Sequence, residues 1–173
     1  LTQQTKVLMG KKVKNQILAK DKNVIVIGGG DTGSDCIGTS NRQGARSVTN
    51  FEIMPKPPGH RSPQTPWPYW PLQLKTSSSH KEGCERNWLI NTKEFMTDEN
   101  GKLISLKTVN VEWITEIGKR PELKEIIGTE KIYPCDLALL ALGFTGPEST
   151  IAEQLGLELD SRSNYKSEYG NYK

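Results

Sequence analysis

Four β-branched residues followed at once by three glycines constrain the fold of this chain more than any other feature. Val24-Ile25-Val26-Ile27 is a continuous apolar run, typical of a parallel strand covered on both faces. Gly28-Gly29-Gly30-Asp31-Thr32-Gly33 follows it, and a helical apolar pattern then runs to about Gly44. Residues 47–53 are again strand-like. We therefore expect a β-α-β unit with a glycine turn between the first strand and the helix.

The glycines fit the G-x-G-x-x-G pattern, in which each glycine has its own task. We expect Gly28 to permit the tight turn, Gly30 to let the backbone approach a pyrophosphate, and Gly33 to let the helix pack closely on the sheet. Amides at the helix start would hold the anion. The pattern alone is a weak signal, but its place between strand and helix favours nucleotide binding. The alternative is a glycine-rich turn without a ligand, which Asp31, an acid near the anion site, favours.

The choice between NADH and NADPH depends on the end of the second predicted strand. Glu52 stands there, and a carboxylate can accept hydrogen bonds from both ribose hydroxyls of NADH while repelling a 2′-phosphate. Lys56, His60 and Arg61 follow closely and could instead pair with a 2′-phosphate. The alternative for these three cations is a solvated loop. The sequence thus favours NADH and leaves NADPH open.

No nucleophile, base and acid stand in a pattern that indicates catalysis by side chains. Hydride transfer needs none, because the cofactors carry the chemistry. His60 and His80 lie in or beside a Pro/Ser-rich stretch, where a surface or hydrogen-bonding role is expected. Asp35, one turn into the helix, is a weaker candidate for facing a nicotinamide or flavin, with simple solvation as the alternative. Cys36 is expected to pack between helix and sheet.

The rest of the chain divides by composition. Residues 1–22 predict an amphipathic lead-in helix. Residues 54–79 hold seven of the ten prolines and cannot form a regular helix or an internal strand. Residues 87–134 alternate strand-like runs with turn signals, which predicts a β-meander. Residues 135–143 predict another buried strand, which returns to the parallel sheet.

The Pro-rich loop, residues 54–79, also carries large aromatic side chains, notably Trp67, Tyr69 and Trp70. A solvated linker rarely exposes that much aromatic surface. We expect these side chains to pack, with the loop against the protein body, a neighbouring subunit or a domain outside this chain. A homo-oligomer formed through this loop is one of those alternatives.

Composition narrows the classes of partner. The net charge is +3 and the basic residues are scattered, which argues against nucleic acid as a partner. No apolar run approaches the ~18–20 residues of a membrane span. The cysteines form no C-x-x-C pair and so suggest neither a metal nor an iron–sulfur site; they are typical of reduced thiols in a cytoplasmic protein, at positions Cys36, Cys84 and Cys135.

Four runs of the sequence closely resemble one family. They are Gly-Gly-Gly-Asp-Thr-Gly-Ser-Asp-Cys-Ile-Gly-Thr-Ser at 28–40, Phe-Glu-Ile-Met-Pro-Lys-Pro-Pro at 51–58, Pro-Trp-Pro-Tyr-Trp-Pro at 66–71 and Leu-Leu-Ala-Leu-Gly-Phe at 139–144. These runs resemble the glutamate synthase small-subunit (beta-chain) family, including the matching region of the fused eukaryotic enzyme. The resemblance covers nearly the whole chain, and its Pro-Trp loop is far more specific than the glycine motif.

The resemblance implies an α/β fold, a Rossmann-like three-layer dinucleotide-binding domain with a central parallel sheet and a β-meander. This is the two-dinucleotide-binding flavoprotein type of adrenodoxin reductase and thioredoxin reductase. The NAD(P)H-binding domain would occupy residues 23–150, and residues 151–173 would lead back toward an FAD domain outside this chain. The resemblance carries over Gly28, Gly30, Asp31, Thr32 and Gly33 for the pyrophosphate, Glu52 for the adenosine ribose, Arg61 in the adjoining loop, and Gly143 near the nicotinamide–flavin junction. Gly29 and Lys56 complete the cofactor-binding residues that we expect.

In that family, electrons would pass from NAD(P)H to FAD and then through iron–sulfur clusters to FMN, where 2-oxoglutarate and glutamine-derived ammonia give glutamate. The glycine motif for FAD, the cysteine clusters and the late Gly-Asp motif are absent from this sequence. We therefore expect the chain to bind NADH or NADPH, to be inactive alone, and to need the FAD domain and the large (alpha) region as partners. FAD, FMN and the clusters would belong only to the full-length enzyme.

Two other functions stay open at this point. One is the NAD(P)H domain of another FAD and iron–sulfur reductase, such as a dihydropyrimidine dehydrogenase-like or ferredoxin-linked enzyme, against which the Pro-Trp loop argues. The other is a non-catalytic scaffold whose aromatic loop docks a partner while the nucleotide site stays idle.

Overall fold

A computed structural model describes residues 1–63, 65–69, 71–116, 118–144, 146–167 and 170. The chain divides into two compact units, Leu1–Leu142 and Gly143–Lys173. This division falls before the domain boundary predicted at residue 150. The first unit holds both β-sheets and the glycine turn.

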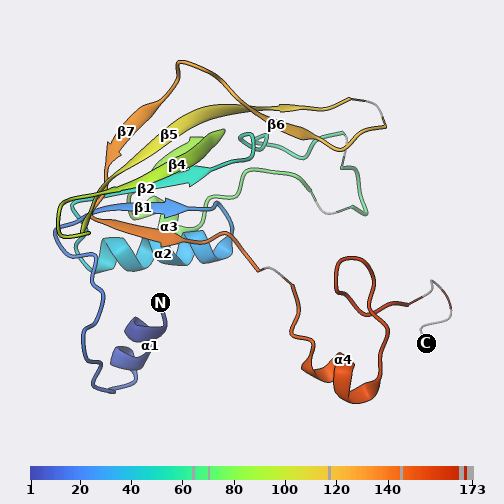
Figure 1. Cartoon of the computed structure of the whole chain (residues 1–173), viewed down its shortest axis with the longest axis horizontal. Helices are drawn as coiled ribbons and strands as arrows, with labels where there is room; N and C mark the ends of the chain where they lie inside the picture. The colour runs from blue at the N-terminus through green and yellow to red at the C-terminus, as the bar shows by residue number, and fades with distance from the viewer. Residues whose placement is uncertain (64, 70, 117, 145, 168–169, 171–173) are drawn as a thin grey trace. The chain divides into compact units, whose positions relative to one another are not determined.

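A four-stranded parallel sheet forms the centre of the first unit (Figure 1). Its strands are β1 (Asn23–Ile27), β2 (Ser47–Glu52), β3 (Glu85–Trp88) and β8 (Leu137–Leu140), in the order β3-β2-β1-β8. Every neighbouring pair is parallel. The carboxyl ends of these strands therefore meet at one edge, where ligands of open α/β sheets bind.

One face of the parallel sheet is covered by α2 (Asp31–Arg42), the helix that the glycine turn opens. The short helix α3 (Ser78–Lys81) lies beside α2. Side chains from β1, β2, α2 and the segment before β1 fill the layer between α2 and the sheet, namely Ala19, Val24, Val26, Cys36, Ile37 and Val48. Cys36 is buried there, as the sequence predicted.

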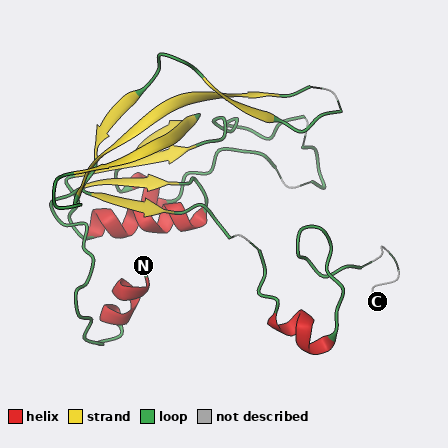
Figure 2. Cartoon of the chain, in the orientation of Figure 1, coloured by secondary structure: helices red, strands yellow, loops and turns green. Residues whose placement is uncertain are grey.

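An antiparallel sheet packs on the other face (Figure 2). It consists of β4 (Ile90–Thr97), β5 (Leu103–Ile114), β6 (Glu122–Glu125) and β7 (Lys131–Pro134), and β5 pairs with the other three. Buried side chains join the two sheets, namely Ile25, Phe51, Leu106 and Cys135. Helix, parallel sheet and antiparallel sheet make the three layers expected of the Rossmann-like fold, which is confirmed.

The strand that precedes the meander differs from the prediction. Residues 87 and 88 were expected in the β-meander, but they end β3, which pairs with β2 in the parallel sheet. Leu89 follows with a φ of 59° and separates β3 from β4. A residue in this left-handed conformation cannot continue a strand, so the chain leaves one sheet there and enters the other.

The predicted lead-in helix over residues 1–22 is wrong in length. Only α1 (Thr2–Leu8) is helical. Gly10 follows it with a φ of 74° and donates its amide to the Val7 carbonyl at 2.9 Å, a glycine termination typical of helix ends. The remaining residues are held by amide contacts, in which Gln4 Oε1 accepts from Gln16 Nε2 at 3.1 Å and from Gln43 Nε2 at 2.8 Å.

The second unit contains α4 (Thr150–Leu155), which ends at Gly156 in the left-handed conformation. A single β-bridge then joins Leu159 to Tyr165. Across the described parts of both units, no helix combines the length and apolarity that crossing a membrane requires.

Candidate functional site

The glycine turn is held by the backbone of β2. Gly28 has a φ of 114°, and its amide donates to the Phe51 carbonyl at 2.8 Å. The Asn50 side chain lies 2% exposed and donates from Nδ2 to the carbonyls of Val26, at 3.0 Å, and Gly28, at 2.9 Å. Sequence reasoning missed Asn50, although a polar residue inside an apolar strand was the available signal. These contacts fix the turn before any ligand arrives.

At two positions of the turn, glycine is required because backbone atoms of other residues approach too closely for a Cβ. A Cβ on Gly28 would collide with the Ala141 carbonyl, and a Cβ on Gly33 would collide with the Gly28 carbonyl oxygen. The tight turn and the close packing of helix on sheet that the sequence predicted for these positions are both present. Gly30 differs, because a Cβ built there meets no heavy atom within 4 Å. Packing within the chain therefore does not explain a glycine at position 30.

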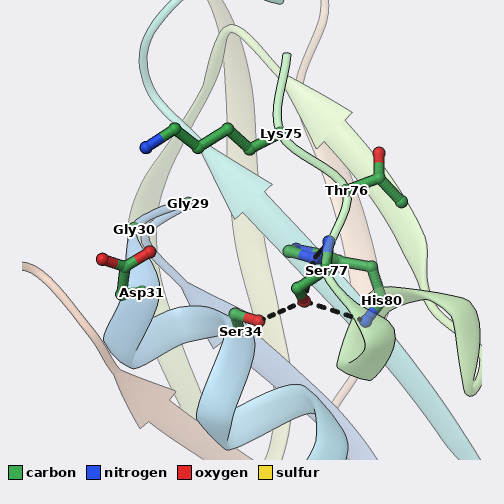
Figure 3. Close-up of a pocket in the computed structure, with 8 residues that line it drawn as sticks. All are labelled: Gly29, Gly30, Asp31, Ser34, Lys75, Thr76, Ser77 and His80. Carbon is green, nitrogen blue, oxygen red and sulfur yellow. Dashed lines mark hydrogen bonds between the residues drawn. The ribbon is translucent and has the colours of Figure 1, made fainter.

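The space beside Gly30 is a cavity of about 470 Å³ (Figure 3). Gly30 is the N-cap of α2 and makes no side-chain capping bond, so no side chain of its own satisfies the first amides of the helix. The cavity is lined by the glycine turn and α2 on one side and by α3 and the segment before it on the other, namely Gly29, Gly30, Asp31, Ser34, Lys75, Thr76, Ser77 and His80. Sequence reasoning did not assign the residues of this second wall to the site.

Glu52, at the end of β2, reaches back to the glycine turn. Its Oε2 accepts from the Gly29 amide at 2.6 Å, and its Oε1 accepts from the Met54 amide at 3.1 Å. A second cavity of about 180 Å³ begins at this carboxylate. The cavity is also lined by Lys75, Arg86 and Trp88. An acid and two cations therefore border the same space.

Two cations lie close to Trp88, which lines this second cavity. The Lys56 Nζ atom is 5.0 Å and the Arg86 Cζ atom 5.1 Å from the centre of a Trp88 ring. Arg86 also donates from Nη1 to the Lys75 carbonyl at 3.1 Å. Lys56 thus lies beside Trp88, although it lines neither cavity. Arg86 was missed because β3 was not assigned to the parallel sheet, and Lys75 was missed because it lies in the Pro-rich loop, whose path no local pattern predicts.

Other predicted site residues lie elsewhere. Arg61 donates from Nη1 to the carbonyls of Thr65, at 3.1 Å, and Tyr69, at 3.0 Å, so it binds the Pro-rich loop itself. Thr32 and Asp35 are exposed on α2 and line neither cavity. Gly143 opens the second unit with a φ of 86°, and its part in the site stays a prediction.

A third, apolar cavity of about 360 Å³ lies where β1, β2 and β8 end and β4 begins. Gly28 and Glu52 border it, together with apolar side chains that include Ile27, Phe51, Ile90, Phe95, Leu140 and Leu142. All three cavities therefore meet residues of the glycine turn.

Three side chains form a hydrogen-bonded chain across the first cavity (Figure 3). The Ser34 and Ser77 Oγ atoms are 2.5 Å apart, and Ser77 Oγ is 2.8 Å from His80 Nδ1. Burial, and to a lesser extent the charge of Arg86, lowers the pKa of His80 below its ordinary value of 6.5. His80 is therefore neutral at physiological pH.

The cysteines are free thiols whose burial disfavours the thiolate. Burial raises the pKa of Cys84 to about 11 and also raises the pKa values of Cys36 and Cys135. In the described part of the chain, no three His, Cys, Asp or Glu side chains are grouped so that they could hold a metal ion.

The chain is similar to glutamate synthases along nearly all of its length. It is 42% identical to glutamate synthase [NADH] of Schizosaccharomyces pombe over 99% of this chain and 8% of that protein. It is 43% identical to the glutamate synthase [NADPH] small chain of Mycobacterium tuberculosis over 86% of this chain and 29% of that protein. The chain thus spans less than a third of these relatives. No family model matches it.

Solved structures share the fold. Thioredoxin reductase of T. acidophilum superposes with a TM-score of 0.57 at 19% identity, covering 84% of this chain and 38% of that one. FprA, a Mycobacterium tuberculosis oxidoreductase, gives a TM-score of 0.58 at 12% identity, covering 89% of this chain and 45% of that one. At such identities these similarities show the fold alone.

Proposed function

We propose that this chain, which belongs to the glutamate synthase small-chain family, binds the pyridine dinucleotide that delivers hydride to the full-length enzyme. The family identified from the sequence is confirmed by relatives at 37–43% identity. Their names include both NADH and NADPH enzymes. The choice of cofactor must therefore be argued from the site itself.

The observation that carries the proposal is the open space at Gly30. The position follows a parallel strand and caps a 12-residue helix, and the first amides of a helix have no acceptor within it, which favours an anion there. The glycine is not needed for packing, so we attribute it to a ligand that comes too close for a Cβ. The pyrophosphate of the dinucleotide would occupy the cavity beside it, with Lys75 on the far wall offsetting the charge of Asp31.

We assign the adenosine ribose to Glu52 and propose a preference for NADH. Each oxygen of the Glu52 carboxylate accepts one hydrogen bond from a backbone N–H group. Further lone pairs remain that can accept hydrogen bonds from ribose hydroxyls. A 2′-phosphate at the same place would meet a like charge. Lys75 and Arg86 border the same cavity and weaken this discrimination, so the preference depends on Glu52.

Gly30→Ala tests the position of the pyrophosphate. The backbone of Gly30, at φ −79° and ψ −171°, suits any residue and the new methyl group has room, so the free energy of unfolding should change little. Binding of NADH, measured by calorimetry, should weaken at least tenfold, because the methyl group would occupy the space of the ligand. Gly59→Ala, at another glycine whose Cβ meets nothing, is the matched control and should bind normally.

Two results would overturn this proposal. If the unmodified chain binds neither NADH nor NADPH, the scaffold function is favoured instead. If Gly30→Ala binds NADH as well as the unmodified chain, the pyrophosphate does not lie at the helix start. For the cofactor preference, tighter binding of NADPH than of NADH would contradict the role of Glu52, and Glu52→Gln should narrow the difference between them.

We further propose that FAD, FMN and the iron–sulfur clusters of the full-length enzyme are held outside this chain. The chain covers only 8% of the fused relative and 29% of a small chain, which leaves room for an FAD domain and the large region as partners. Residues 151–173 would lead toward the FAD domain, and the protein would be cytoplasmic. A longer protein that includes the adjoining sequence should show flavin absorbance, whereas this chain should be colourless.

A further inference from the structure

In Figure 3, the hydrogen bond between the Ser34 and Ser77 hydroxyl groups is the only contact drawn between the two walls of the cavity. Ser34 belongs to the first turns of α2, and Ser77 is the N-cap of α3. Their Oγ atoms are 2.5 Å apart. A hydroxyl pair at the wall of an anion-binding cavity can either clamp the wall or bind the anion.

His80 determines which hydroxyl group of this pair donates a hydrogen bond and which one accepts it. The Ser77 amide donates to His80 Nδ1 at 3.2 Å, so Nδ1 carries no proton. The Ser77 hydroxyl, 2.8 Å from Nδ1, can then donate to it and accept from the Ser34 hydroxyl. The proton of neutral His80 is on Nε2, which is buried with no partner among the residues that the structure describes. The ring is therefore held in place through its Nδ1 contacts.

The same oxygen positions allow a second arrangement of protons. If the Ser77 hydroxyl turns and donates to Ser34 Oγ, the Ser77 amide still satisfies His80 Nδ1. Ser77 Oγ still accepts from the His80 amide at 3.4 Å. The Ser34 hydroxyl is then free to donate into the cavity. Rotation of the hydroxyl groups alone can therefore direct one O–H donor at an anion, and no heavy atom has to move.

We propose that Ser34 donates a hydrogen bond to a pyrophosphate oxygen of the dinucleotide, and that Ser77 and His80 are positioning residues that hold its hydroxyl in place. This inference rests on the proposed function, since the pyrophosphate must lie in this cavity. It adds a specific contact from outside the glycine turn, on the helix side of the site. Hydrogen bonds to charged oxygens are among the stronger ones in proteins.

Ser34→Ala tests the contact most directly, because Ser77 is the one hydrogen-bond partner of the Ser34 hydroxyl among the described residues, and α2 gains a good helix former. Binding of NADH should weaken about tenfold. In NMR titrations, the variant should lose affinity for ADP, which carries a pyrophosphate, and keep its affinity for adenosine, which has none. Ser34→Thr restores the hydroxyl and should bind within about threefold of the unmodified chain.

The positioning role of His80 is tested by substitutions that keep or remove a hydrogen-bond acceptor at the Nδ1 position. His80→Asn places an amide oxygen near the Nδ1 position and should keep NADH binding, whereas His80→Gln leaves that position without an acceptor and should weaken it about fivefold. His60→Gln, in the exposed loop, is the matched control. Long-range proton–nitrogen NMR should also show His80 as the Nε2–H tautomer before and after NADH is added.

The results separate this inference from the proposed function. If the unmodified chain binds no dinucleotide, both fail. If it binds NADH and Ser34→Ala binds NADH and ADP equally well, only the contact is overturned. If Ser34→Ala weakens the binding of ADP and of adenosine to the same extent, the serine pair only holds the two walls of the cavity together, and the contact is again overturned. Equal binding by His80→Asn and His80→Gln would overturn the positioning role of His80.

Discussion

The glycine turn, residues 28–33, and the Pro-rich loop both leave the carboxyl edge of the parallel sheet, but they are fixed in different ways. The turn is held by groups on another strand, since Gly28 donates to Phe51 and accepts from Asn50. The described residues in the middle of the Pro-rich loop, between 58 and 74, are held by bonds to one another. Arg61 binds the carbonyls of Thr65 and Tyr69, and the Leu74 amide donates to the Pro58 carbonyl at 2.8 Å.

This difference decides where side chains are tolerated. At Gly28 and Gly33 there is no room for a single carbon atom. In the Pro-rich loop large side chains have room, since Trp67 is 83% and Tyr69 68% exposed. The expectation that these two side chains pack is therefore wrong within this chain. Trp70 lies outside the described residues, and packing against a subunit or another domain stays a prediction.

The largest expected effect is that of Gly28→Ala. The alanine Cβ would collide with the Ala141 carbonyl, and the alanine backbone would have to keep a φ of 114°. The free energy of unfolding, measured by urea denaturation, should fall by about 3 kcal/mol or more. Gly44→Ala separates the two causes, because Gly44 has a φ of 80° but room for a Cβ, and should cost about 1–2 kcal/mol. Equal costs would show that collision is unimportant.

The next largest effect should come from Asn50→Ala. The substitution removes both side-chain bonds to the Val26 and Gly28 carbonyls in a buried place. Urea denaturation should show a loss of about 2 kcal/mol. Asn87→Ala is a suitable control, since Asn87 Nδ2 donates to the exposed Glu85 carboxylate, and it should cost less than ~0.5 kcal/mol. If both variants are equally stable, the turn does not depend on Asn50.

Substitution of the loop aromatics should do far less. Trp67→Ser and Tyr69→Ser remove exposed side chains, so the free energy of unfolding should change by less than ~0.5 kcal/mol. Sedimentation velocity of the same variants tests the interface. A shift from dimer to monomer would support a homo-oligomer formed through the loop, and a loss above ~1 kcal/mol in a monomer would show that these side chains pack after all.

The smallest effect concerns His80 and pH. Its pKa is lowered in the folded state, so the unfolded chain binds more protons as the pH falls through the ordinary value of 6.5. Stability should therefore decline as the pH falls through 6.5, and level off below the pKa of the folded state. His80→Asn should reduce this decline when thermal unfolding is compared at pH 7.5 and pH 5.5. An unchanged pH dependence would show that other groups cause it.

The sequence predicted the elements whose pattern is local. β1, α2 and β2 were placed within one or two residues, because a β-branched run, a glycine pattern and a helical apolar period each act over a few neighbours. The length of α1 was wrong, since the apolar stripe continued beyond Gly10, the residue that ends the helix. Glu52 borders the cavities, and Lys56 lies near Trp88, which lines one of them. Arg61, which was also predicted at the site, binds the Pro-rich loop itself, because the path of such a loop depends on its own bonds.

What the sequence alone determined is the β-α-β unit, the need for glycine at positions 28 and 33, and the family. What only the tertiary structure decided is which distant residues complete the site. β3 brings Arg86 and Trp88 beside Glu52, and α3 with its N-cap brings His80 and Ser77 to the cavity at the glycine turn. No local pattern encodes these neighbours, because they come from strand pairing and packing between segments far apart in the chain.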